Sequence, residues 1–392
     1  MMPMQLNIII ACDKYKGSLS AVQVCETIKN SILEISNKIN IITCPMADGG
    51  EGTVDTLVES QKGKYIELFV KDPLGKKIKS RFGIINDSTA VIEMSSASGL
   101  TLLSVKERNP LKTTTYGTGE MIKKAIELGC KTIILGIGGS ATTDAGMGIG
   151  QALGVEFYDK KSNALGFGGG ELLKLESIDL SKINHPIKDI KIIVACDIDN
   201  PLYGPNGAAY VFGPQKGADE NMVKILDEGL KNFAKVVKNN LKKRINNIKG
   251  AGAAGGVGAG LVAFFNAELK SGADIVIDLI KLEDRIKDSD LVITGEGSMD
   301  NQTFYGKSSF AVAKLGKKYK IPVISINGSV NIDYNNIANS KKNLFSGNFD
   351  IINKPMSLNF ALENSKCLIN SSTKEIINFF LSVRQKYLGH SE

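Results

Sequence analysis

The feature that most constrains the fold is an alternation that repeats along the chain. Short runs of β-branched residues are followed by glycine-rich turns and then by helical patterns. Such alternation is typical of βαβ units, in which helices cover a mainly parallel sheet. It therefore predicts an α/β fold. The strands that we expect in one parallel sheet are 6–11, 41–44, 132–137, 291–294 and 323–326.

Other local signals refine this pattern. Ser20 is followed three positions later by Gln23 and then by apolar residues at helical spacing, so a capped amphipathic helix should begin there. Three more runs, separated by turn signals, break the βαβ rhythm and predict a small antiparallel meander. These runs are 65–70, 78–85 and 90–94.

A chain of 392 residues is longer than one hydrophobic core usually serves, so we expect two domains. The meander, together with 190–195 and 208–212, is assigned to a second α/β domain that interrupts a doubly wound one. The doubly wound domain is expected at 1–62, 115–165 and 285–392. The second, smaller domain is expected at 63–114 and 166–284.

Charge alone does not identify the partner. The formal charge of +7 and a pI of about 8.9 suit any anionic partner. Much of the excess lies in 231–249, where apolar residues recur at helical spacing beneath lysines. Because aromatic residues do not alternate with these lysines, a solvated helix face is favoured and nucleic-acid binding is not expected.

The apolar stretches, the cysteines and the histidines bear on the cellular compartment and on the catalytic groups that are available. No apolar stretch reaches the roughly 18 residues of a membrane span, and six scattered cysteines without ligand spacing suit a reducing compartment. We therefore expect a cytoplasmic protein. The two histidines, His185 and His390, lie beside a proline and near the C-terminus, so acid–base chemistry should fall to carboxylates or lysines.

Polar loops follow the predicted strands. In open α/β sheets, ligands bind beyond the carboxyl ends of the strands, so these loops are the candidate site. The first loop, CDKYKGS, carries Lys14 and Lys16, and the second, PMADGGEGT, carries Asp48, Glu51 and Thr53.

The loop GIGGSATTDAG follows the predicted strand 132–137. Its glycines let backbone N–H groups approach a ligand closely, and its hydroxyls lie near a helix N-terminus. This combination attracts phosphate, although a tight strand-to-helix turn is the alternative explanation. The residues expected to hold a nucleotide here are Gly136, Gly138, Gly139, Ser140 and Thr142.

The loop GEGSMDNQT places Glu296 and Asp300 four positions apart, an oxygen-rich setting for Mg²⁺. The alternative is a loop cap beside a solvated aspartate. In VACDIDNPLYG, Asp197 and Asp199 follow a strand and could orient a substrate hydroxyl, or could be simple turn residues.

Two known glycine motifs for nucleotide binding are not expected to act in this chain. GAGAAG at 250–255 matches a dinucleotide fingerprint but follows polar residues instead of a strand, so a Rossmann site is not expected. The GxxxxGK[ST] phosphate loop is also missing, because Asn301 stands where its first glycine belongs. Any ATP site is therefore of another type.

Eight ordered segments resemble the type I glycerate kinase family, from the N-terminus to about residue 330. They are CDKYKGSLSA, PMADGGEGT, NPLKTTTYGTGE, GIGGSATTDAG, ACDIDNPLYG, FGPQKGA, GAGAAGGVGA and TGEGSMDNQT. The resemblance implies a discontinuous flavodoxin-like domain and a second domain similar to a restriction-endonuclease core. Two departures are Ser298, where the family usually carries arginine, and SINGS around Asn327.

The resemblance also implies Mg-ATP-dependent phosphorylation of D-glycerate, usually at the 2-hydroxyl, in glyoxylate or sugar-acid catabolism. The expected catalytic residues are Asp197 as base and Lys14, Lys16 and Lys216 at phosphate or carboxylate groups. Gly295, Gly297 and Lys307 are expected at the nucleotide, and Glu296 and Asp300 at Mg²⁺. The expected substrate residues are Asp48, Glu51, Thr53, Thr115 and Thr118.

Alternatives stay open at this stage. Transfer to the 3-hydroxyl would give 3-phosphoglycerate, and residue spacing does not distinguish the two hydroxyls. A non-catalytic sensor of a sugar acid or nucleotide would keep the fold without the chemistry. A nicotinamide oxidoreductase would depend on GAGAAG alone. The sequence leaves open whether the protein is a homo-oligomer.

Overall fold

The structure is a computed structural model that describes residues 5–183, 187, 189–332 and 344–388. The chain divides into two compact units. The first comprises the residues up to Asp48 and those from Ala273 onward, and the second is Gly49–Gly272. The second unit therefore interrupts the first, as expected.

The first unit is built on a five-stranded sheet in which every pair of neighbours is parallel. Its strands are β1 (Asn7–Cys12), β2 (Asn40–Thr43), β11 (Leu291–Gly295), β13 (Val323–Asn327) and β15 (Gly347–Asp350). The spatial order is β2-β1-β11-β13-β15, which in chain order reads 2-1-3-4-5, the flavodoxin-like order. The strand order reverses between β1 and β11, so this unit should bind ligands there.

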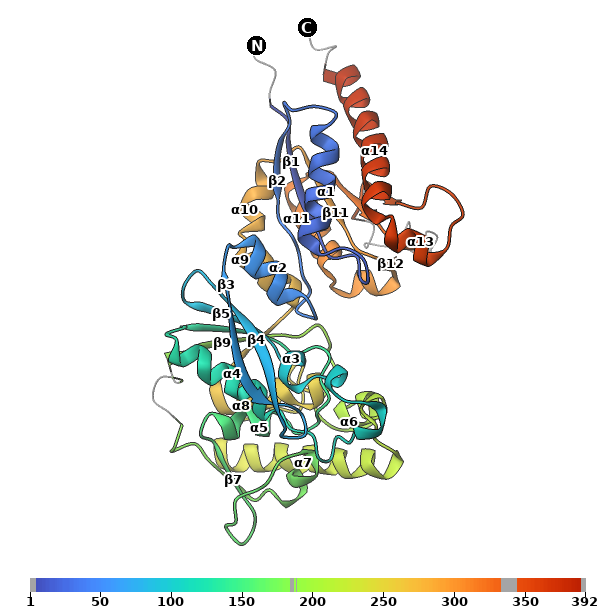
Figure 1. Cartoon of the computed structure of the whole chain (residues 1–392). Helices are drawn as coiled ribbons and strands as arrows, with labels where there is room; N and C mark the ends of the chain where they lie inside the picture. The colour runs from blue at the N-terminus through green and yellow to red at the C-terminus, as the bar shows by residue number, and fades with distance from the viewer. Residues whose placement is uncertain (1–4, 184–186, 188, 333–343, 389–392) are drawn as a thin grey trace. The chain divides into compact units, whose positions relative to one another are not determined.

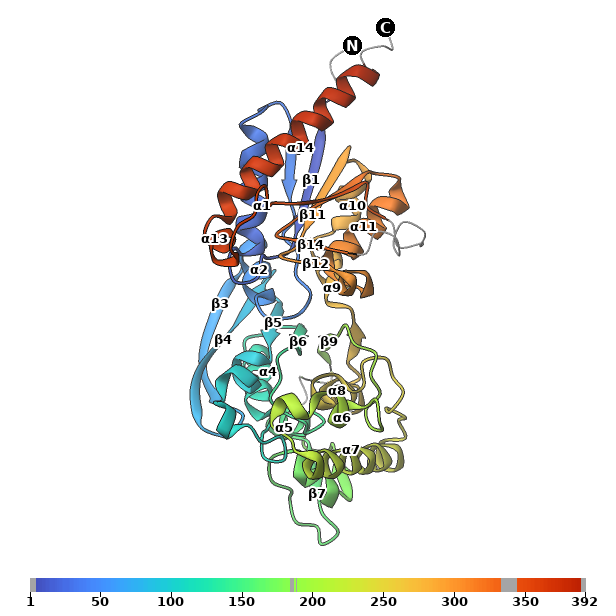
Figure 2. The same ribbon diagram turned by 90° about the vertical axis from the view of Figure 1, so that its right-hand side faces the viewer.

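Helices and one small strand pair complete the first unit. They are α1 (Ala21–Leu33), α9 (Gly272–Leu279), α10 (Leu282–Lys287), α11 (Ser308–Tyr319), α13 (Leu358–Glu363), α14 (Ser365–Leu388), β12 (Met299–Asp300) and β14 (Val330–Asn331). The predicted capping box begins α1, because Ser20 Oγ accepts from Gln23 N and Gln23 Oε1 accepts from Ser20 N. Figures 1 and 2 show α14 beside α1, where Asn370 Nδ2 donates to Ser31 Oγ at 3.0 Å.

The second unit contains a six-stranded mixed sheet. Its strands, in spatial order, are β10 (Glu268–Lys270), β9 (Lys191–Ala195), β6 (Thr132–Gly136), β5 (Thr89–Glu93), β4 (Lys77–Ile85) and β3 (Lys64–Lys71). Strand β4 pairs antiparallel with β3 and with β5, which confirms the predicted meander. The other pairs are parallel. A separate pair is β7 (Glu156–Tyr158) with β8 (Ser177–Asp179).

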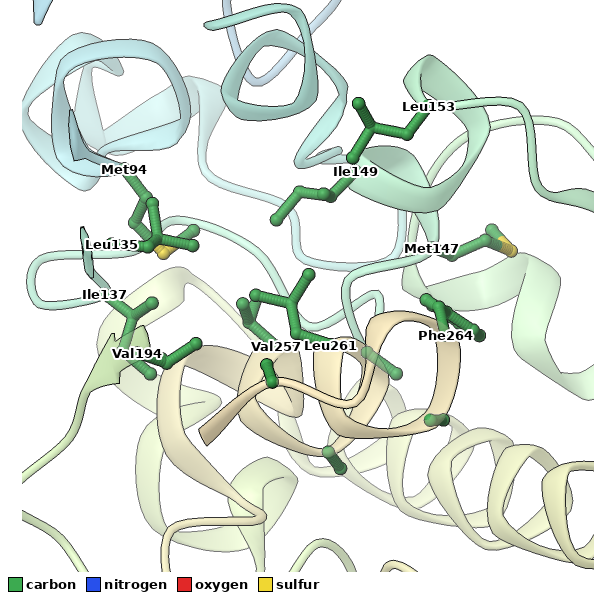
Figure 3. Close-up of a cluster of buried hydrophobic side chains, with 14 of the residues drawn as sticks. Met94, Leu135, Ile137, Met147, Ile149, Leu153, Val194, Val257, Leu261 and Phe264 are labelled. Carbon is green, nitrogen blue, oxygen red and sulfur yellow. The ribbon is translucent and has the colours of Figure 1, made fainter. Parts of the chain in front are cut away.

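The core of the second unit surrounds a wholly apolar helix. The helices are α2 (Thr53–Ser60), α3 (Ser95–Ser98), α4 (Tyr116–Glu127), α5 (Met147–Ala152), α6 (Ala208–Phe212), α7 (Glu220–Leu241) and α8 (Val257–Phe265). Helix α8 has no polar face and is buried almost along its whole length. Figure 3 shows Val257 and Leu261 of α8 close to Ile149 of α5 and Ile137 after β6.

The structure corrects the sheet to which one predicted strand belongs and the bounds of the two units. Residues 132–137 were wrongly placed in the first sheet, since β6 pairs with β5 and β9 in the second. Accordingly 49–62 and 115–165 lie in the second unit, 273–284 lie in the first, and the interrupting unit is the longer one. Residues 190–195 extend the second unit as β9, and 208–212 as helix α6. The likeness to a restriction-endonuclease core stays a prediction.

The lysine-rich segment behaves largely as the sequence predicts. Helix α7 buries Phe233, Val236 and Val237 beneath exposed lysines, and it ends at Leu241, before the last residues of the segment. Across the residues described, none of the helices has the length and apolar character needed to cross a membrane.

Candidate active site

Asp13 lies at the strand-order reversal of the first unit, directly after β1. Its backbone N–H donates to Gly295 O at 2.8 Å, while Oδ1 accepts from Lys14 N at 2.7 Å and Oδ2 accepts from Ser308 Oγ at 2.9 Å. Removal from water, together with the charge on Asp48, raises the pKa of Asp13 to about 7 despite these hydrogen bonds. A carboxyl group that titrates near neutral pH at this position indicates a functional site.

Glycine is required where the loop after β11 meets neighbouring backbone. A Cβ on Gly295 would lie 1.7 Å from Ile326 O, and one on Gly297 would lie 3.0 Å from Lys16 N. The loops after β1 and β11 are therefore in direct contact at Lys16 and Gly297. Both predicted nucleotide glycines lie at the carboxyl edge of the flavodoxin-like sheet, as expected.

The predicted metal residues form an ion-pair cluster with Lys307. Lys307 Nζ lies 3.2 Å from Glu296 Oε2 and 3.7 Å from Asp300 Oδ1. Burial raises the pKa of Glu296, although the Lys307 ammonium group opposes this shift. Burial would lower the pKa of Lys307, but the charges on Glu296 and Asp300 outweigh it and raise that pKa.

One oxygen of this cluster is available for a cation. Glu296 Oε1 is buried and has no hydrogen-bond partner among the residues described. No group of three or more His, Cys, Asp or Glu side chains in the described part of the chain is placed to hold a metal ion. Mg²⁺ bound to nucleotide commonly uses only one or two carboxylates besides phosphate oxygens and water, so Glu296 and Asp300 fit it.

Asn327 supports Glu296 and was not predicted to do so. Its Oδ1 accepts from Glu296 N at 3.2 Å, and its Nδ2 donates to Phe349 O at 3.1 Å, which joins the loop after β11 to β15. Ser298 lies at the surface, where its hydroxyl accepts from Ser329 Oγ at 3.2 Å. Asn327 of the SINGS segment thus has a structural role in this chain.

In the second unit, the loop 136–143 follows β6 against a neighbouring loop. A Cβ on Gly136 would lie 2.4 Å from Gly49 O, and one on Gly138 would lie 3.5 Å from Gly50 Cα. A Cβ on Gly49 would itself lie 2.5 Å from Ala195 Cβ. The glycines thus allow the start of the second polar loop to lie against the carboxyl ends of β6 and β9.

Lys216 is a buried cation that holds this loop. Only 2% of its surface is exposed, and its Nζ donates to Ser140 Oγ at 3.0 Å and to Thr142 O at 2.6 Å. Burial lowers the pKa of Lys216 to about 7, against an opposing effect of the Asp144 carboxylate. The family resemblance implies that Lys216 contacts a phosphate or a carboxylate, and the structure joins it to the predicted phosphate loop.

Asp144 is a second buried group that was not predicted. Its carboxylate accepts from Thr115 N and Thr115 Oγ1, both at 2.9 Å, and from Gly146 N and Gly148 N at 3.1 and 3.2 Å. It therefore ties the start of α4 to the start of α5. The aspartate stands within GIGGSATTDAG, but the sequence does not show which side chain its carboxylate contacts.

Hydroxyl groups of the predicted site divide into two kinds. Thr115 is bonded to Asp144, and Thr118 Oγ1 lies 2.8 Å from Ser98 Oγ, so both hydroxyls are used within the protein. Contact of these two with a substrate stays a prediction. By contrast, the fully buried Thr142 Oγ1 and Thr143 Oγ1 have no hydrogen-bond partner among the residues described. Unpartnered hydroxyls in a glycine-rich loop fit a phosphate ligand.

The remaining predicted residues are divided between the two units. Asp197 follows β9, is exposed, and accepts from Gly272 N at 3.2 Å through Oδ1. Thr53 begins α2 and donates to Gly50 O at 2.7 Å, and Glu51 is exposed in the preceding turn. Asp48 belongs to the first unit, where its charge acts on Asp13.

The glycine pattern GAGAAG does not follow a strand in the structure. GAGAAG lies in turns and a short 3₁₀ segment, and a Cβ on its last glycine, Gly255, would lie 2.1 Å from Thr142 O. It supports the phosphate loop and does not form a strand-to-helix fingerprint. His185 and His390 lie outside the residues that the structure describes.

The comparisons with known proteins agree with this arrangement. The model of the glycerate kinase family matches residues 8–381. The chain is 49% identical to a glycerate 2-kinase of Escherichia coli K12 over 329 residues, which are 84% of this chain and 86% of that protein. It is 43% identical to a glycerate kinase of Bacillus cereus over 383 residues, which are 97% of this chain and all 100% of that protein.

A solved structure extends the agreement to the fold. It is described as a glycerate kinase 2 of Salmonella typhimurium LT2, and it matches with a TM-score of 0.89 at 40% identity. The match covers 97% of this chain and 100% of that chain. The chain therefore belongs to the glycerate kinase family and is an enzyme of that family.

Proposed function

We propose that this enzyme transfers the γ-phosphoryl group of ATP to the 2-hydroxyl of D-glycerate, with Mg²⁺ as cofactor. The observation that carries the proposal is the cluster of Glu296, Asp300 and Lys307 at the strand-order reversal of the flavodoxin-like sheet. It combines two carboxylates for a metal with a cation for phosphate oxygens. The relative from Escherichia coli is a glycerate 2-kinase, which favours transfer to the 2-hydroxyl.

Phosphoryl transfer requires mainly alignment and neutralisation of charge, so positively charged groups and backbone N–H groups should do most of the work. When bound, Mg-ATP supplies the phosphoryl group. Lys307, Lys14 and Lys16 are the side chains in the first unit that would neutralise phosphate oxygens. In the second unit, Lys216 holds Ser140 in place, so the loop can present its amides and hydroxyls.

Asp197 is our candidate for the base. An exposed carboxylate beyond a strand end can accept the proton of the attacking hydroxyl, and Gly272 N holds this carboxylate in position through Oδ1. We assign substrate positioning to Asp48, Glu51 and Thr53, on the loop PMADGGEGT that follows β2. The reaction would need no histidine.

The direct test couples the product to enolase, which accepts 2-phosphoglycerate. Purified protein incubated with D-glycerate, ATP and Mg²⁺ should give phosphoenolpyruvate promptly. Appearance of phosphoenolpyruvate only after phosphoglycerate mutase is added would instead show transfer to the 3-hydroxyl. Absence of ADP with D-glycerate would exclude D-glycerate as the substrate and favour another hydroxy acid or a sensor.

Removal of the carboxylate charge at Glu296 should weaken Mg²⁺ binding. We expect Glu296→Gln to raise the Mg²⁺ concentration for half-maximal rate by about tenfold, because one charged oxygen ligand is lost. The measurement is initial rate against free Mg²⁺ at fixed ATP. Glu283→Gln removes a carboxylate that pairs with Lys318 near the surface and should leave this concentration unchanged.

The Mg²⁺ profile also separates two roles for Glu296. Its carboxylate pairs with Lys307, so the alternative role of Glu296 is only to position that lysine. In that case Glu296→Gln would lower the rate by the same factor at every Mg²⁺ concentration. Such a parallel decrease would rule Glu296 out as a metal ligand.

A further inference from the structure

A basic groove lies along α7, in the second unit, and none of the residues proposed for phosphoryl transfer lines it. Its volume is about 1050 Å³, close to the upper size of small-molecule sites. The lining comes from one face of α7, from the segment 244–248 that follows this helix, and from Leu173 and Tyr203. Figures 1 and 2 show α7 as the long yellow-green helix of this unit.

Cations dominate the wall of this groove. Lys231, Lys235 and Lys238 follow one another at intervals of four and three positions, so they share one face of α7. Arg244 also lines the groove. Glu228 is the one acidic residue in the described lining, and it pairs with Lys231 at 3.2 Å. The groove therefore keeps a net positive charge.

These charges are not used within the protein. No ion pair or side-chain hydrogen bond of Lys235, Lys238 or Arg244 is found among the residues described, and all three side chains are exposed. Solvated lysines on a convex helix face usually need no partner. Here, however, they border a concave space, where charges of one sign raise the local concentration of an anion.

The rest of the lining combines apolar and aromatic residues with three asparagines, Asn232, Asn246 and Asn247. Tyr203, Ile245 and Ile248 are partly or fully buried, and Leu173 is 46% exposed, which is high for a leucine. A groove lined by cations, amide side chains, an aromatic ring and aliphatic side chains fits an anion that carries an apolar or ring portion. A bare chloride ion would use only part of it.

The groove is joined to the loop that continues from Asp197. Asn246 O accepts from Leu202 N at 3.1 Å, and Asn246 Oδ1 accepts from Tyr203 N at 3.3 Å. Next to the lining, Lys249 pairs with Asp199 at 3.4 Å. A molecule in the groove would therefore contact residues that hold this loop.

We propose that the groove along α7 binds a small anion of the phosphate class, such as a nucleotide or a phosphorylated metabolite. Lysine and arginine are suited to phosphate oxygens, with Arg244 able to form paired hydrogen bonds. Tyr203 provides a surface for a ring. The site is separate from the proposed phosphoryl-transfer residues, and its test needs no turnover.

The experiment uses inorganic pyrophosphate and, in a second series, AMP as probes for the full chain. Hydrogen–deuterium exchange should show slower exchange at 203–204 and 244–249 when pyrophosphate is added, and calorimetry should show saturable binding. We expect Lys235→Glu to weaken this binding by about tenfold and to abolish the protection. The overall kinase rate, measured in parallel, serves as the check that the variant is folded.

Lys224→Glu is the matched control. Lys224 lies on α7, is exposed, and does not line the groove, so its substitution makes the same change in net charge. The proposal requires Lys224→Glu to retain the protection and to change pyrophosphate affinity by less than about twofold. Equal weakening by both variants would show attraction to overall charge only and would overturn the site. Unchanged protection in Lys235→Glu, or no protection in the wild type, would also overturn it.

The AMP series identifies the source of the phosphate group. If AMP binds more tightly than pyrophosphate and Tyr203→Ala weakens AMP alone, the ligand is a nucleotide. If the two probes bind equally and Tyr203→Ala affects neither, the ligand is a phosphorylated metabolite without a stacking ring. Both results support a phosphate-class site.

Discussion

Replacing Asp197 by asparagine should lower kcat by roughly 10² to 10⁴, the usual contribution of a general base. The melting temperature should hardly change, because Asp197 is exposed and the amide oxygen of asparagine can still accept the hydrogen bond from Gly272 N. What is lost is the charge and basicity needed to accept the proton of the hydroxyl. The measurement is kcat and KM for D-glycerate together with thermal unfolding.

Asp199 provides a control two positions away on the same loop. It is also exposed, and it pairs with Lys249 at 3.4 Å on the surface, where such pairs contribute little. Asp199→Asn should therefore leave kcat within about twofold of the wild type. If Asp197→Asn is as active as Asp199→Asn, the base lies elsewhere, and Asp13 becomes the first residue to examine because its pKa is raised to about 7.

The fold could be predicted from sequence where local pattern determines it. The first and third strands of the flavodoxin-like sheet, β1 and β11, and the capped start of α1 follow from residue spacing. The assignment of 132–137 failed because an apolar parallel strand looks alike in either sheet. Its position depends on pairing with β5 and β9, and strand pairing between distant segments leaves no mark in a single sequence.

The site shows the same division between local and long-range information. Residues directly after strands, such as Glu296 and Gly138, could be predicted because ligands bind beyond the carboxyl ends of parallel strands. Ser308 was missed because its partner Asp13 lies 295 positions away, and Asp144 because its partner Thr115 lies 29 positions away. Only the folded chain shows which polar groups meet.

Lys216→Met should reduce both the catalytic rate and the pH dependence of stability. Methionine fills a similar volume without a charge, so the hydrogen bonds to Ser140 Oγ and Thr142 O are lost and the phosphate loop loses its fixed position. We expect kcat to fall by about 10² to 10³, the scale found for loss of one preorganised donor. Lys174→Met, at an exposed lysine that pairs with Glu171, should leave kcat unchanged.

The stability effect has a definite sign. The pKa of Lys216 is about 7 in the folded protein and near its ordinary, higher value in the unfolded chain, so between these values the unfolded chain binds more protons. The free energy of unfolding of the wild type should therefore rise with pH above 7, by on the order of 1 kcal/mol per pH unit from this residue.

Below pH 7 both states are protonated and the slope contributed by Lys216 vanishes. Denaturant unfolding of the wild type and of Lys216→Met at pH 6, 7, 8 and 9 isolates the contribution of Lys216 to the free energy of unfolding. The other titrating groups are common to both proteins. The difference in unfolding free energy should be flat from pH 6 to 7 and then grow in favour of the wild type. If the difference in unfolding free energy is instead constant from pH 7 to 9, Lys216 keeps an ordinary pKa in the folded protein. Its ammonium group is then reached by water or paired with a carboxylate.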